Sequence, residues 1–200
     1  MTVRNYAGET PILNGTGISL PDPNQGLVSI VNSAYVRIEG LTVNNANGRS
    51  IYGRYSNHVQ VVNNSTYNSL NSGVMLTGTD YGLIQGNDIQ RACNADLGNA
   101  SEEPISIDFS DYVDCCYNHV HNGANHQTSG GEGINTKSGC HDVWVHHNIV
   151  HLGPLRPDTN PFTKPGLSID HFNGYGGDTY NVYYYNNISY DNGNGLYIGY

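Results

Sequence analysis

The sequence predicts an all-β fold, a single-stranded parallel β-helix of about seven coils, and three observations support that prediction. A pair of short alternating strands recurs along the chain, an Asn recurs at a fixed distance after one strand of each pair, and the composition disfavours helices. With 25 Gly and 16 Tyr but only 2 Met and 3 Phe, the chain is poor in helix formers and rich in turn and strand residues. We expect residues 1–200 to form one domain.

One strand of each repeat begins with an anchor residue after which polar and apolar residues alternate. Successive anchors are separated by 23, 23, 31, 30 and 39 residues. A constant unit with variable additions indicates loops inserted into stacked coils, as in solenoid proteins. The anchors are Val36, Val59, Gly82, Val113, Val143 and Val182.

The residue five positions after each anchor is Asn in every repeat except the first, and these residues form a column. Asn side chains at the same bend of successive coils can form an inward ladder of amides that satisfies backbone groups of the turn. We therefore expect the column to stack at one corner of the coil. Its members are Leu41, Asn64, Asn87, Asn118, Asn148 and Asn187.

Each repeat has a second strand that precedes the anchored strand. The first residues of the two strands are 8 positions apart in the first coils that carry both, and up to 15 positions apart in later coils. Antiparallel sandwiches join neighbouring strands by hairpin turns and give no reason for such a constant phase. A parallel β-helix explains both the phase and the Asn column. These strands begin at Ile51, Val74, Ile105, Ile134, Leu167 and Leu196.

The charge balance restricts the partners. The chain has 8 Lys+Arg against 17 Asp+Glu and a net charge of −9, which repels phosphate backbones. We therefore expect no nucleic-acid partner. We also expect no membrane partner, since no stretch approaches the ~20 apolar residues needed to span a bilayer.

The first residues alternate like a strand and lack the pattern of a signal peptide. We expect a secreted or cell-surface protein whose leader is absent from this sequence.

The opening segment, residues 3–16, resembles the first coil of the right-handed parallel β-helix proteins of the pectate-lyase-like superfamily. Together with the repeats, the resemblance covers nearly the whole chain and implies a right-handed coil. This superfamily includes lyases, hydrolases, epimerases, phage tailspikes and structural solenoids. The function must therefore be argued from a site rather than from the fold.

Two outward columns are candidates for that site. Strand alternation places Asn135 and Lys137 on the outer face, and the same register applies to every coil. Because neighbouring coils stack ~4.8 Å apart, the sequence predicts a contiguous row of acid, base and acid. The row is Asp108, Lys137 and Asp170, and the adjacent substrate-binding column is Ser106, Asn135 and Ser168.

Long insertions flank the row. Segments 90–103, 121–132 and 151–165 precede its three strands, and segment 171–180 follows the last strand. Long loops on one edge of a regular scaffold commonly carry function, whereas an exposed ladder of charges contributes only ~0.2–1 kcal/mol per pair. We expect the insertions to wall one polysaccharide or oligosaccharide cleft. The residues expected at its rim are Glu102, Glu103, His126, Glu132, Arg156, Lys164, His171, Phe172 and Tyr175.

Two histidines, His121 and His151, share a column at the base of two insertions. Two imidazoles in register are more often stacked surface groups than metal ligands. Since no third fixed ligand accompanies them, we do not expect a metal site here.

The segment from Glu132 to Ser138 resembles a segment of the alginate lyase and chondroitinase B group. A lyase acting on a uronate polysaccharide needs a base beside the carboxylate-bearing carbon and a cation or donors for the carboxylate. The resemblance implies that Glu132 binds calcium and that Lys137 abstracts the proton. We favour this β-elimination, although Asp108 and Asp170 are expected to raise the pKa of Lys137.

A glycoside hydrolase is the alternative enzyme class. Two coils separate Asp108 from Asp170, or ~9.6 Å between backbone positions, near the upper end of the ~6.5–9.5 Å expected for inverting enzymes. Lys137 between them is expected to keep both carboxyl groups ionised. A third class, a non-catalytic solenoid that binds glycan or displays loops, predicts no activity.

The sequence stops at a segment, residues 195–200, that matches the start of another coil. An uncovered coil exposes core side chains and unpaired backbone groups, here at Leu196 and Ile198. We therefore expect either that the chain is a piece of a longer polypeptide or that it associates end to end with another molecule.

Overall fold

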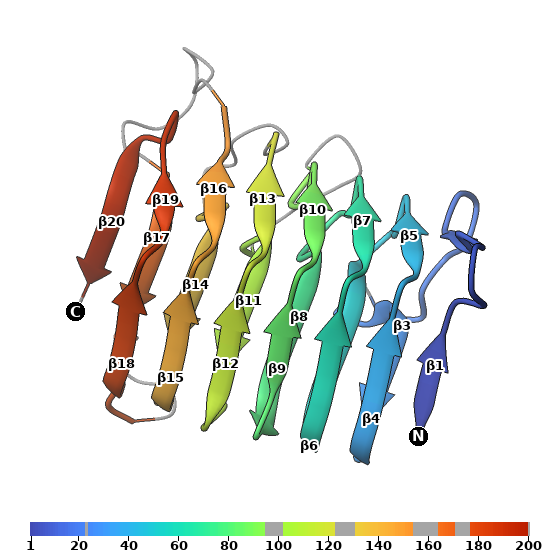
Figure 1. Ribbon diagram of the computed structural model, residues 1–200, viewed down its shortest axis with the longest axis horizontal. Coiled ribbons are helices and arrows are strands. Elements are labelled where there is room, and N and C mark those ends of the chain that lie inside the picture. The colour runs from blue at the N-terminus through green and yellow to red at the C-terminus, as the bar shows by residue number, and fades with distance from the viewer. Residues whose placement is uncertain (23, 95–101, 123–130, 154–163, 171–176, 200) are drawn as a thin grey trace.

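The computed structural model describes residues 1–22, 24–94, 102–122, 131–153, 164–170 and 177–199. These residues form strands and turns, and no helix in these ranges is long and apolar enough to cross a membrane. Every strand pair recorded is parallel, and the coils stack side by side along one axis (Figure 1). The predicted all-β parallel β-helix is confirmed.

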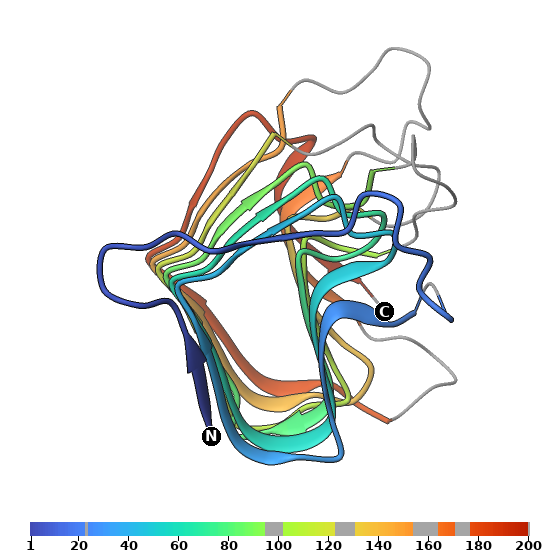
Figure 2. The same cartoon turned by 90° about the vertical axis from the view of Figure 1, so that its right-hand side faces the viewer.

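Viewed along the axis, each coil has three faces (Figure 2). The first and second faces form one 13-stranded sheet, because β6 (Arg49–Val62) runs through the corner between them and pairs on both. The remaining strands of the first face are β3 (Gly26–Val31), β8 (Val74–Asp80), β11 (Ile105–Asp108), β14 (Ile134–Lys137), β17 (Pro165–Asp170) and β20 (Asn194–Gly199).

The second face continues from the first after a tight corner. In the coil of β11, the corner lies between Asp108 and Val113. The remaining strands of this face are β1 (Thr2–Arg4), β4 (Ala34–Glu39), β9 (Leu83–Gln85), β12 (Val113–Cys116), β15 (His141–His146) and β18 (Tyr180–Tyr185).

The third face is a sheet of seven strands, which agrees with the predicted number of coils. After each strand of this face, the chain continues to the first-face strand of the next coil. The strands are β2 (Ile12–Asn14), β5 (Thr42–Asn44), β7 (Ser65–Tyr67), β10 (Asp88–Gln90), β13 (His119–His121), β16 (Ile149–His151) and β19 (Ile188–Ser189).

The core fills the centre of the coil with β-branched and aliphatic side chains from all three faces. In the coil of β11, Ile105, Ile107, Val113 and Cys115 are fully buried, and Val120 closes the third side. Each such aliphatic side chain contributes about 1.5–3 kcal/mol by leaving water. Alternate residues point inward, as the sequence pattern predicts.

The predicted Asn ladder is present at the corner between the second and third faces. Each side-chain Nδ2 donates to Oδ1 of the next Asn at 2.9 to 3.1 Å. In the centre of the ladder, Asn118 Nδ2 also donates to the carbonyl of Ile84 at 2.9 Å, and the Asn118 backbone N donates to Asn148 Oδ1 at 2.9 Å. The stacked residues are Asn64, Asn87, Asn118, Asn148 and Asn187.

The ladder satisfies a corner whose backbone is bent into the left-handed region. The residue before each ladder Asn has positive φ, including Tyr117 at 57° and His147 at 54°. This conformation is unfavourable for residues other than Gly and Asn. At Tyr117 and His147, the amide hydrogen bonds of the ladder therefore hold a backbone shape that the residue does not prefer, whereas Asn63, Gly86 and Asn186 adopt it readily at the other corners.

An aromatic stack follows the corner between the first and second faces and accounts for part of the high Tyr content. Neighbouring ring centroids lie 4.4 to 5.7 Å apart, and most pairs are stacked face to face. Such pairs contribute ~0.5–1.5 kcal/mol each beyond their buried area. The rings belong to Tyr35, His58, Tyr81, Tyr112, His141 and Tyr180.

The last strand, β20, leaves its apolar side chains uncovered. Leu196 is 49% exposed and Ile198 is 61% exposed, whereas Leu167, which pairs with Leu196, is buried. End-to-end self-association stays a prediction.

Replacing Asn118 with Ala is expected to lower the free energy of unfolding by at least about 2 kcal/mol, because several buried backbone and amide partners lose their hydrogen bonds. Urea unfolding followed by circular dichroism measures the change. Asn47→Ala is the matched control, since Asn47 is exposed, and we expect a change within about 0.5 kcal/mol. Equal effects of the two substitutions would contradict a stabilising ladder.

Candidate functional site

The structure places Asp108, Lys137 and Asp170 in one row on the first face. Asp108 pairs with Lys137, and Lys137 pairs with Asp170, at the carboxyl ends of β11, β14 and β17. All three are partly exposed. The register predicted from the repeats therefore brings an acid, a base and an acid together.

The adjacent column has the predicted register but not the predicted exposure. Ser106 pairs with Asn135, and Asn135 pairs with Ser168, yet all three are buried, with at most 1% of each exposed. The expectation that these residues face solvent is wrong. The carboxylate of Glu103 folds back over this column and accepts a hydrogen bond from Ser106 Oγ at 2.7 Å.

Two polar atoms of this covered column lack partners. Asn135 Oδ1 and Ser168 Oγ are buried, and neither has a hydrogen-bond partner in the part of the chain that the structure describes. Most buried polar atoms in folded proteins are paired, so unpaired ones indicate a site for water or a ligand.

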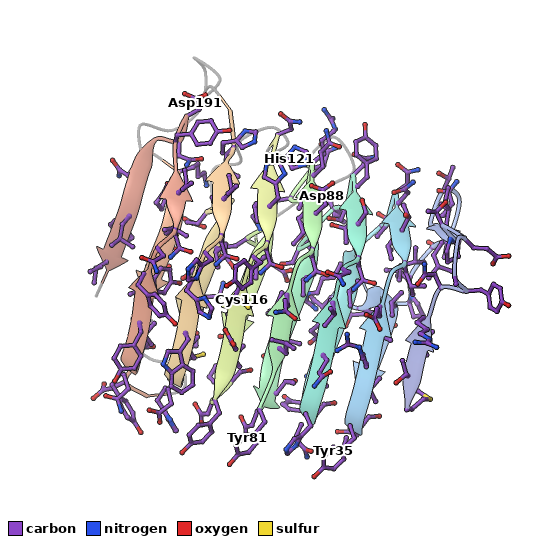
Figure 3. The ribbon with its side chains drawn as sticks, viewed as in Figure 1. Tyr35, Tyr81, Asp88, Cys116, His121 and Asp191 are labelled. Carbon is purple, nitrogen blue, oxygen red and sulfur yellow. The ribbon has the colours of Figure 1, made fainter. Side chains whose placement is uncertain are left out.

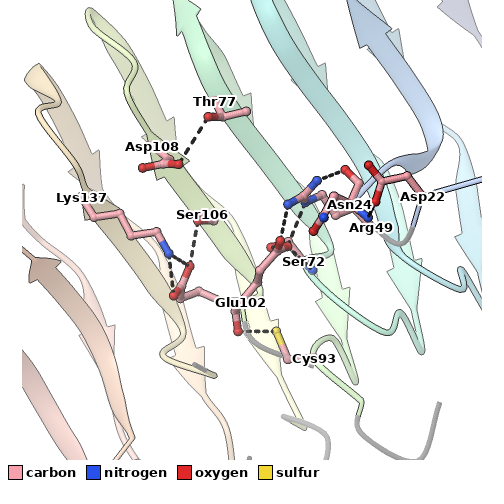
Figure 4. Close-up of polar contacts among 11 residues, drawn as sticks. Asp22, Asn24, Arg49, Ser72, Thr77, Cys93, Glu102, Ser106, Asp108 and Lys137 are labelled. Carbon is pink, nitrogen blue, oxygen red and sulfur yellow. Dashed lines mark hydrogen bonds and ion pairs between the residues drawn. The ribbon is translucent and has the colours of Figure 1, made fainter. Parts of the chain in front are cut away.

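Lys137 is bound by a carboxylate that does not belong to the row. Its Nζ contacts Glu103 Oε1 at 2.9 Å and Oε2 at 2.8 Å (Figure 4). Burial works against the charged form, but the charge and hydrogen bonds of Glu103, with smaller contributions from Asp108 and Glu102, outweigh it and raise the pKa of Lys137. The row therefore contains a cation that holds its proton firmly.

The neighbouring acid, Glu102, binds a second cation that the sequence analysis did not single out. Arg49 Nε donates to Glu102 Oε2 at 2.9 Å, and its Nη2 pairs with Oε1. Ser72 Oγ donates to Glu102 Oε2 at 2.9 Å, while Arg49 Nη1 reaches the carbonyl of Asn24. Glu102 and Glu103 are both buried, so their predicted place at the rim of a cleft is wrong. They instead fasten the segment before β11 onto earlier and later coils.

The pKa of each outer carboxyl group is raised. Burial raises the pKa of Asp108 against the opposing effects of Ser138, Lys137 and Thr77. Burial also raises the pKa of Asp170, although Asp170 Oδ2 accepts a hydrogen bond from Asn135 Nδ2 at 2.7 Å. Lys137 opposes this increase at both groups, in the expected direction, but burial has the larger effect. That both carboxyl groups stay ionised remains a prediction.

A cleft of about 540 Å³ opens beside Asp108 on the outer side of the earlier coils. Its exposed walls include Tyr55 and Phe109, which follow Arg54 and Asp108 in the sequence. Thr77 pairs with both Arg54 and Asp108, so Arg54 and Thr77 continue the column of the row into the earlier coils. Gly78 leaves room for the Tyr55 ring, because a Cβ at this position would lie only 2.8 Å from Tyr55 Cδ1. The cleft is also lined by Asp22, Asn24, Arg49, Tyr52, Arg54, Met75, Thr77 and Asp108.

The calcium site implied for Glu132 finds little support. Burial and the charge of Glu103 raise the pKa of Glu132, and Glu103 itself is occupied by Lys137 and Ser106. Calcium takes six to eight oxygen ligands. Among the described residues, Glu132 belongs to no group of three side chains that could hold a metal ion. We therefore assign no step to calcium.

Several residues predicted at the rim lie outside the described residues. Lys164, in contrast, is described and buried. Those outside are His126, Arg156, His171, Phe172 and Tyr175.

Comparison with known proteins identifies the family. The family model described as "Right handed beta helix region" matches residues 13–171, and the chain belongs to this family. The right-handed parallel β-helix expected from the sequence is confirmed. No curated protein matches the chain.

Two solved structures are similar to this chain at low identity. Full-length tailspike protein 2 from Escherichia coli O157:H7 bacteriophage CAB120 is 13% identical, with a TM-score of 0.47 over 80% of this chain and 23% of that chain. The A-module of the Azotobacter vinelandii mannuronan C-5 epimerase AlgE4 is 12% identical, with a TM-score of 0.28 over 82% of this chain and 62% of that chain. The chain thus spans less than two thirds of each, and these similarities carry no argument about its chemistry.

Replacing Arg49 with Met is expected to lower the free energy of unfolding by about 3–5 kcal/mol, because it leaves the buried Glu102 carboxylate without its counter-ion. The double variant Arg49→Met with Glu102→Met removes both charges and should be more stable than the single variant. Urea unfolding of the two variants measures the difference. A double variant that is less stable than Arg49→Met would show that the pair does not act as a unit.

The raised pKa values of Asp108 and Asp170 predict a pH dependence. Their stabilising effect is fully present below the ordinary Asp value of 3.8 and is lost as pH rises through the higher folded-state values. The double variant Asp108→Asn with Asp170→Asn should therefore be more stable than the parent chain at pH 7 and lose this advantage in acid. Thermal unfolding between pH 3 and pH 7 measures it.

Glu39→Gln provides a control of opposite sign for that experiment. The hydrogen bond from Arg37 lowers the pKa of Glu39, so its stabilisation is present at neutral pH and lost in acid. The Gln variant should be less stable than the parent at pH 7. A destabilised Asp108 and Asp170 double variant at pH 7 would contradict the raised values.

Proposed function

We propose that the protein binds a polysaccharide along the first face and hydrolyses its glycosidic bonds, with Asp108 and Asp170 as the two carboxyl groups. One observation carries this proposal. Two partly buried carboxyl groups with raised pKa lie in register two coils apart, and the first of them, Asp108, lines a cleft with exposed aromatic walls. Glycosidases use such a pair on either side of the scissile bond.

The surroundings of the two carboxyl groups suggest different roles. Asp108 Oδ2 accepts a long hydrogen bond of 3.3 Å from Thr77 Oγ1. Burial raises the pKa of Asp108 despite hydrogen bonds with Ser138 and Thr77, which is the direction that a general acid requires. Asp170 receives the shorter hydrogen bond from Asn135, which favours its charged form relative to Asp108. We assign Asp108 to protonation of the leaving oxygen and Asp170 to activation of water.

The spacing supports inversion rather than retention. Two coils correspond to ~9.6 Å between the backbones that carry the carboxyl groups. Inverting enzymes need ~6.5–9.5 Å between the groups, whereas retaining enzymes need only ~5–5.5 Å. A modest inward lean of the side chains reaches the first range.

The cleft supports a polymer that lies across the coils. Tyr55 and Phe109 present apolar ring surfaces beside Asp108, and Arg54 offers an exposed guanidinium stacked on Tyr55 at 4.5 Å. Sugar-binding sites combine such apolar surfaces with a few polar groups. The polymer would pass from this cleft over the row toward Lys137 and Asp170.

Elimination from a uronate polysaccharide is the second candidate. The observation that favours it is the presence of two cations, Arg54 and Lys137, in equivalent positions of the row's column, since both suit a sugar carboxylate. Lys137 as the base must first give up the proton that Glu103 stabilises. This requirement makes elimination the less favoured candidate.

A secreted or cell-surface location and the lack of nucleic-acid and membrane partners stay predictions.

A panel of polyuronates and neutral glycans incubated with the chain separates the candidates. New reducing ends without unsaturated products support hydrolysis, and ultraviolet absorbance of unsaturated ends supports elimination. Under hydrolysis, Asp108→Asn and Asp170→Asn should each lower kcat about 10²- to 10⁴-fold. Glu39→Gln, on the second face, is the control and should keep the activity of the parent chain.

A charge-neutral double variant tests the role of Lys137. Lys137→Met with Glu103→Gln removes both charges without leaving one buried and unpaired. Elimination by Lys137 predicts complete loss of activity, while hydrolysis predicts residual turnover above that of Asp170→Asn. No reducing ends and no unsaturated products from any glycan that binds would overturn cleavage and leave a binding module.

A further inference from the structure

A separate cluster of imidazoles lies on the outer side of the third face. On β13, Val120 points into the core, so His119 and His121 both project outward. His121 pairs with His151 of the next coil, and His119 pairs with Asp88 of the preceding coil. Figure 3 shows His121 and Asp88 near one another on neighbouring inner strands of this sheet.

The imidazole nitrogens converge. His119 Nε2 lies 3.0 Å from His151 Nε2, and one ring nitrogen from each of the three histidines lies within 4.8 Å of the others. Tetrahedral zinc with Zn–N bonds of ~2.0–2.1 Å separates its nitrogen ligands by about 3.3 Å. The closest pair is thus within a few tenths of an ångström of a coordinating arrangement.

Asp88 faces two of the three rings. Its Oδ1 lies 3.3 Å from His119 Nδ1 and 2.8 Å from His121 Nε2. With Nδ1 of His119 directed at this carboxylate, Nε2 is the nitrogen directed at His151. Metal-binding histidines commonly use such a carboxylate to fix the ring and its tautomer.

Packing holds the rings on both sides. His119 stacks on His121 with centroids 4.1 Å apart, and Tyr190 stacks on His151 at 4.8 Å. All three histidines stand on paired strands rather than on loops. Sites built on rigid elements hold their geometry better than sites built on loops.

We propose that His119, His121 and His151 bind one divalent transition-metal ion of the zinc class, with Asp88 as a positioning residue. Nitrogen ligands select zinc, nickel and copper over calcium and magnesium, which prefer oxygen. Three histidine ligands leave a fourth position for water or an anionic ligand, and His119 is exposed enough for that position to face solvent. The site is independent of the carboxyl row and of calcium.

The sequence-based expectation of stacked surface groups omitted the third ligand. His119 stands two residues before His121, and strand alternation alone places both on one face. A second group that could hold a metal among the described residues consists of Asp114, Cys116 and His146. Burial raises the pKa of the Cys116 thiol to about 12, so this group binds a metal only after losing a firmly held proton.

Titration of the metal-free full chain with Zn²⁺ in a calorimeter, and with Co²⁺ followed by visible absorption, tests the proposal. We expect one ion per chain and the visible bands of tetrahedral Co²⁺. His119→Gln and His151→Gln should each weaken Zn²⁺ binding at least 100-fold, and Asp88→Asn should weaken it about 10- to 100-fold. His58→Gln, which removes a histidine from the aromatic stack, is the matched control and should bind as the parent does.

Circular dichroism of each variant without metal checks that the fold is retained, and binding is interpreted only for folded variants. If a Gln variant fails to fold, His119→Asn and His151→Asn replace it. Binding that survives both ligand substitutions, or binding abolished by His146→Gln, would overturn the proposed site. Absence of Zn²⁺ and Co²⁺ binding to the parent chain would show an imidazole stack only and also overturn it.

Discussion

Parallel pairing of each coil with the next is the constraint on which the rest of the structure depends. It fixes every residue ~4.8 Å from its equivalent in the neighbouring coil, so side chains stack in columns whether or not their chemistry is compatible. Amides and aromatic rings benefit from this arrangement, as the Asn ladder and the aromatic stack show. Charges do not, because like charges directly opposite each other are destabilising. A column of ionisable residues must alternate in sign, receive counter-ions or shift its pKa values, and the row of Asp108, Lys137 and Asp170 does all three.

The counter-ions come from one short segment. Glu102 and Glu103 are neighbours in sequence, yet they bind cations on opposite sides, Arg49 on an earlier coil and Lys137 on a later one. This arrangement uses two of the 8 Lys+Arg of a chain with net charge −9. It covers the column of Ser106, and the charge of Glu103 opposes the effect of the Lys137 charge on the neighbouring carboxyl groups. The same contact therefore makes Lys137 a poor base and contributes to the raised pKa values of Asp108 and Asp170.

Features set by periodicity could be predicted from the sequence, and features set by the return of a long insertion could not. The spacing of the anchors determined the coils, the Asn ladder and the register of Asp108, Lys137 and Asp170. The burial of Asn135 and the pairing of Glu102 with Arg49 depend on where an insertion folds back, which no local pattern records. His119 is a different case, because the alternation that placed Lys137 also places His119 beside His121.

The imidazole cluster and the carboxyl row lie on different faces but share their connections. Among the described residues, the next strand after β13, which ends at His121, is β14, which ends at Lys137. The next described strand after β16, which ends at His151, is β17, which ends at Asp170. A metal ion that joins His121 and His151 would fix the starting points of both insertions, while the strands of the first face fix their ends. Parallel pairing of β13 with β16 already holds these two residues opposite each other. A metal ion would add a second link between the same two coils, at the residues from which the chain continues toward the strands that carry Lys137 and Asp170.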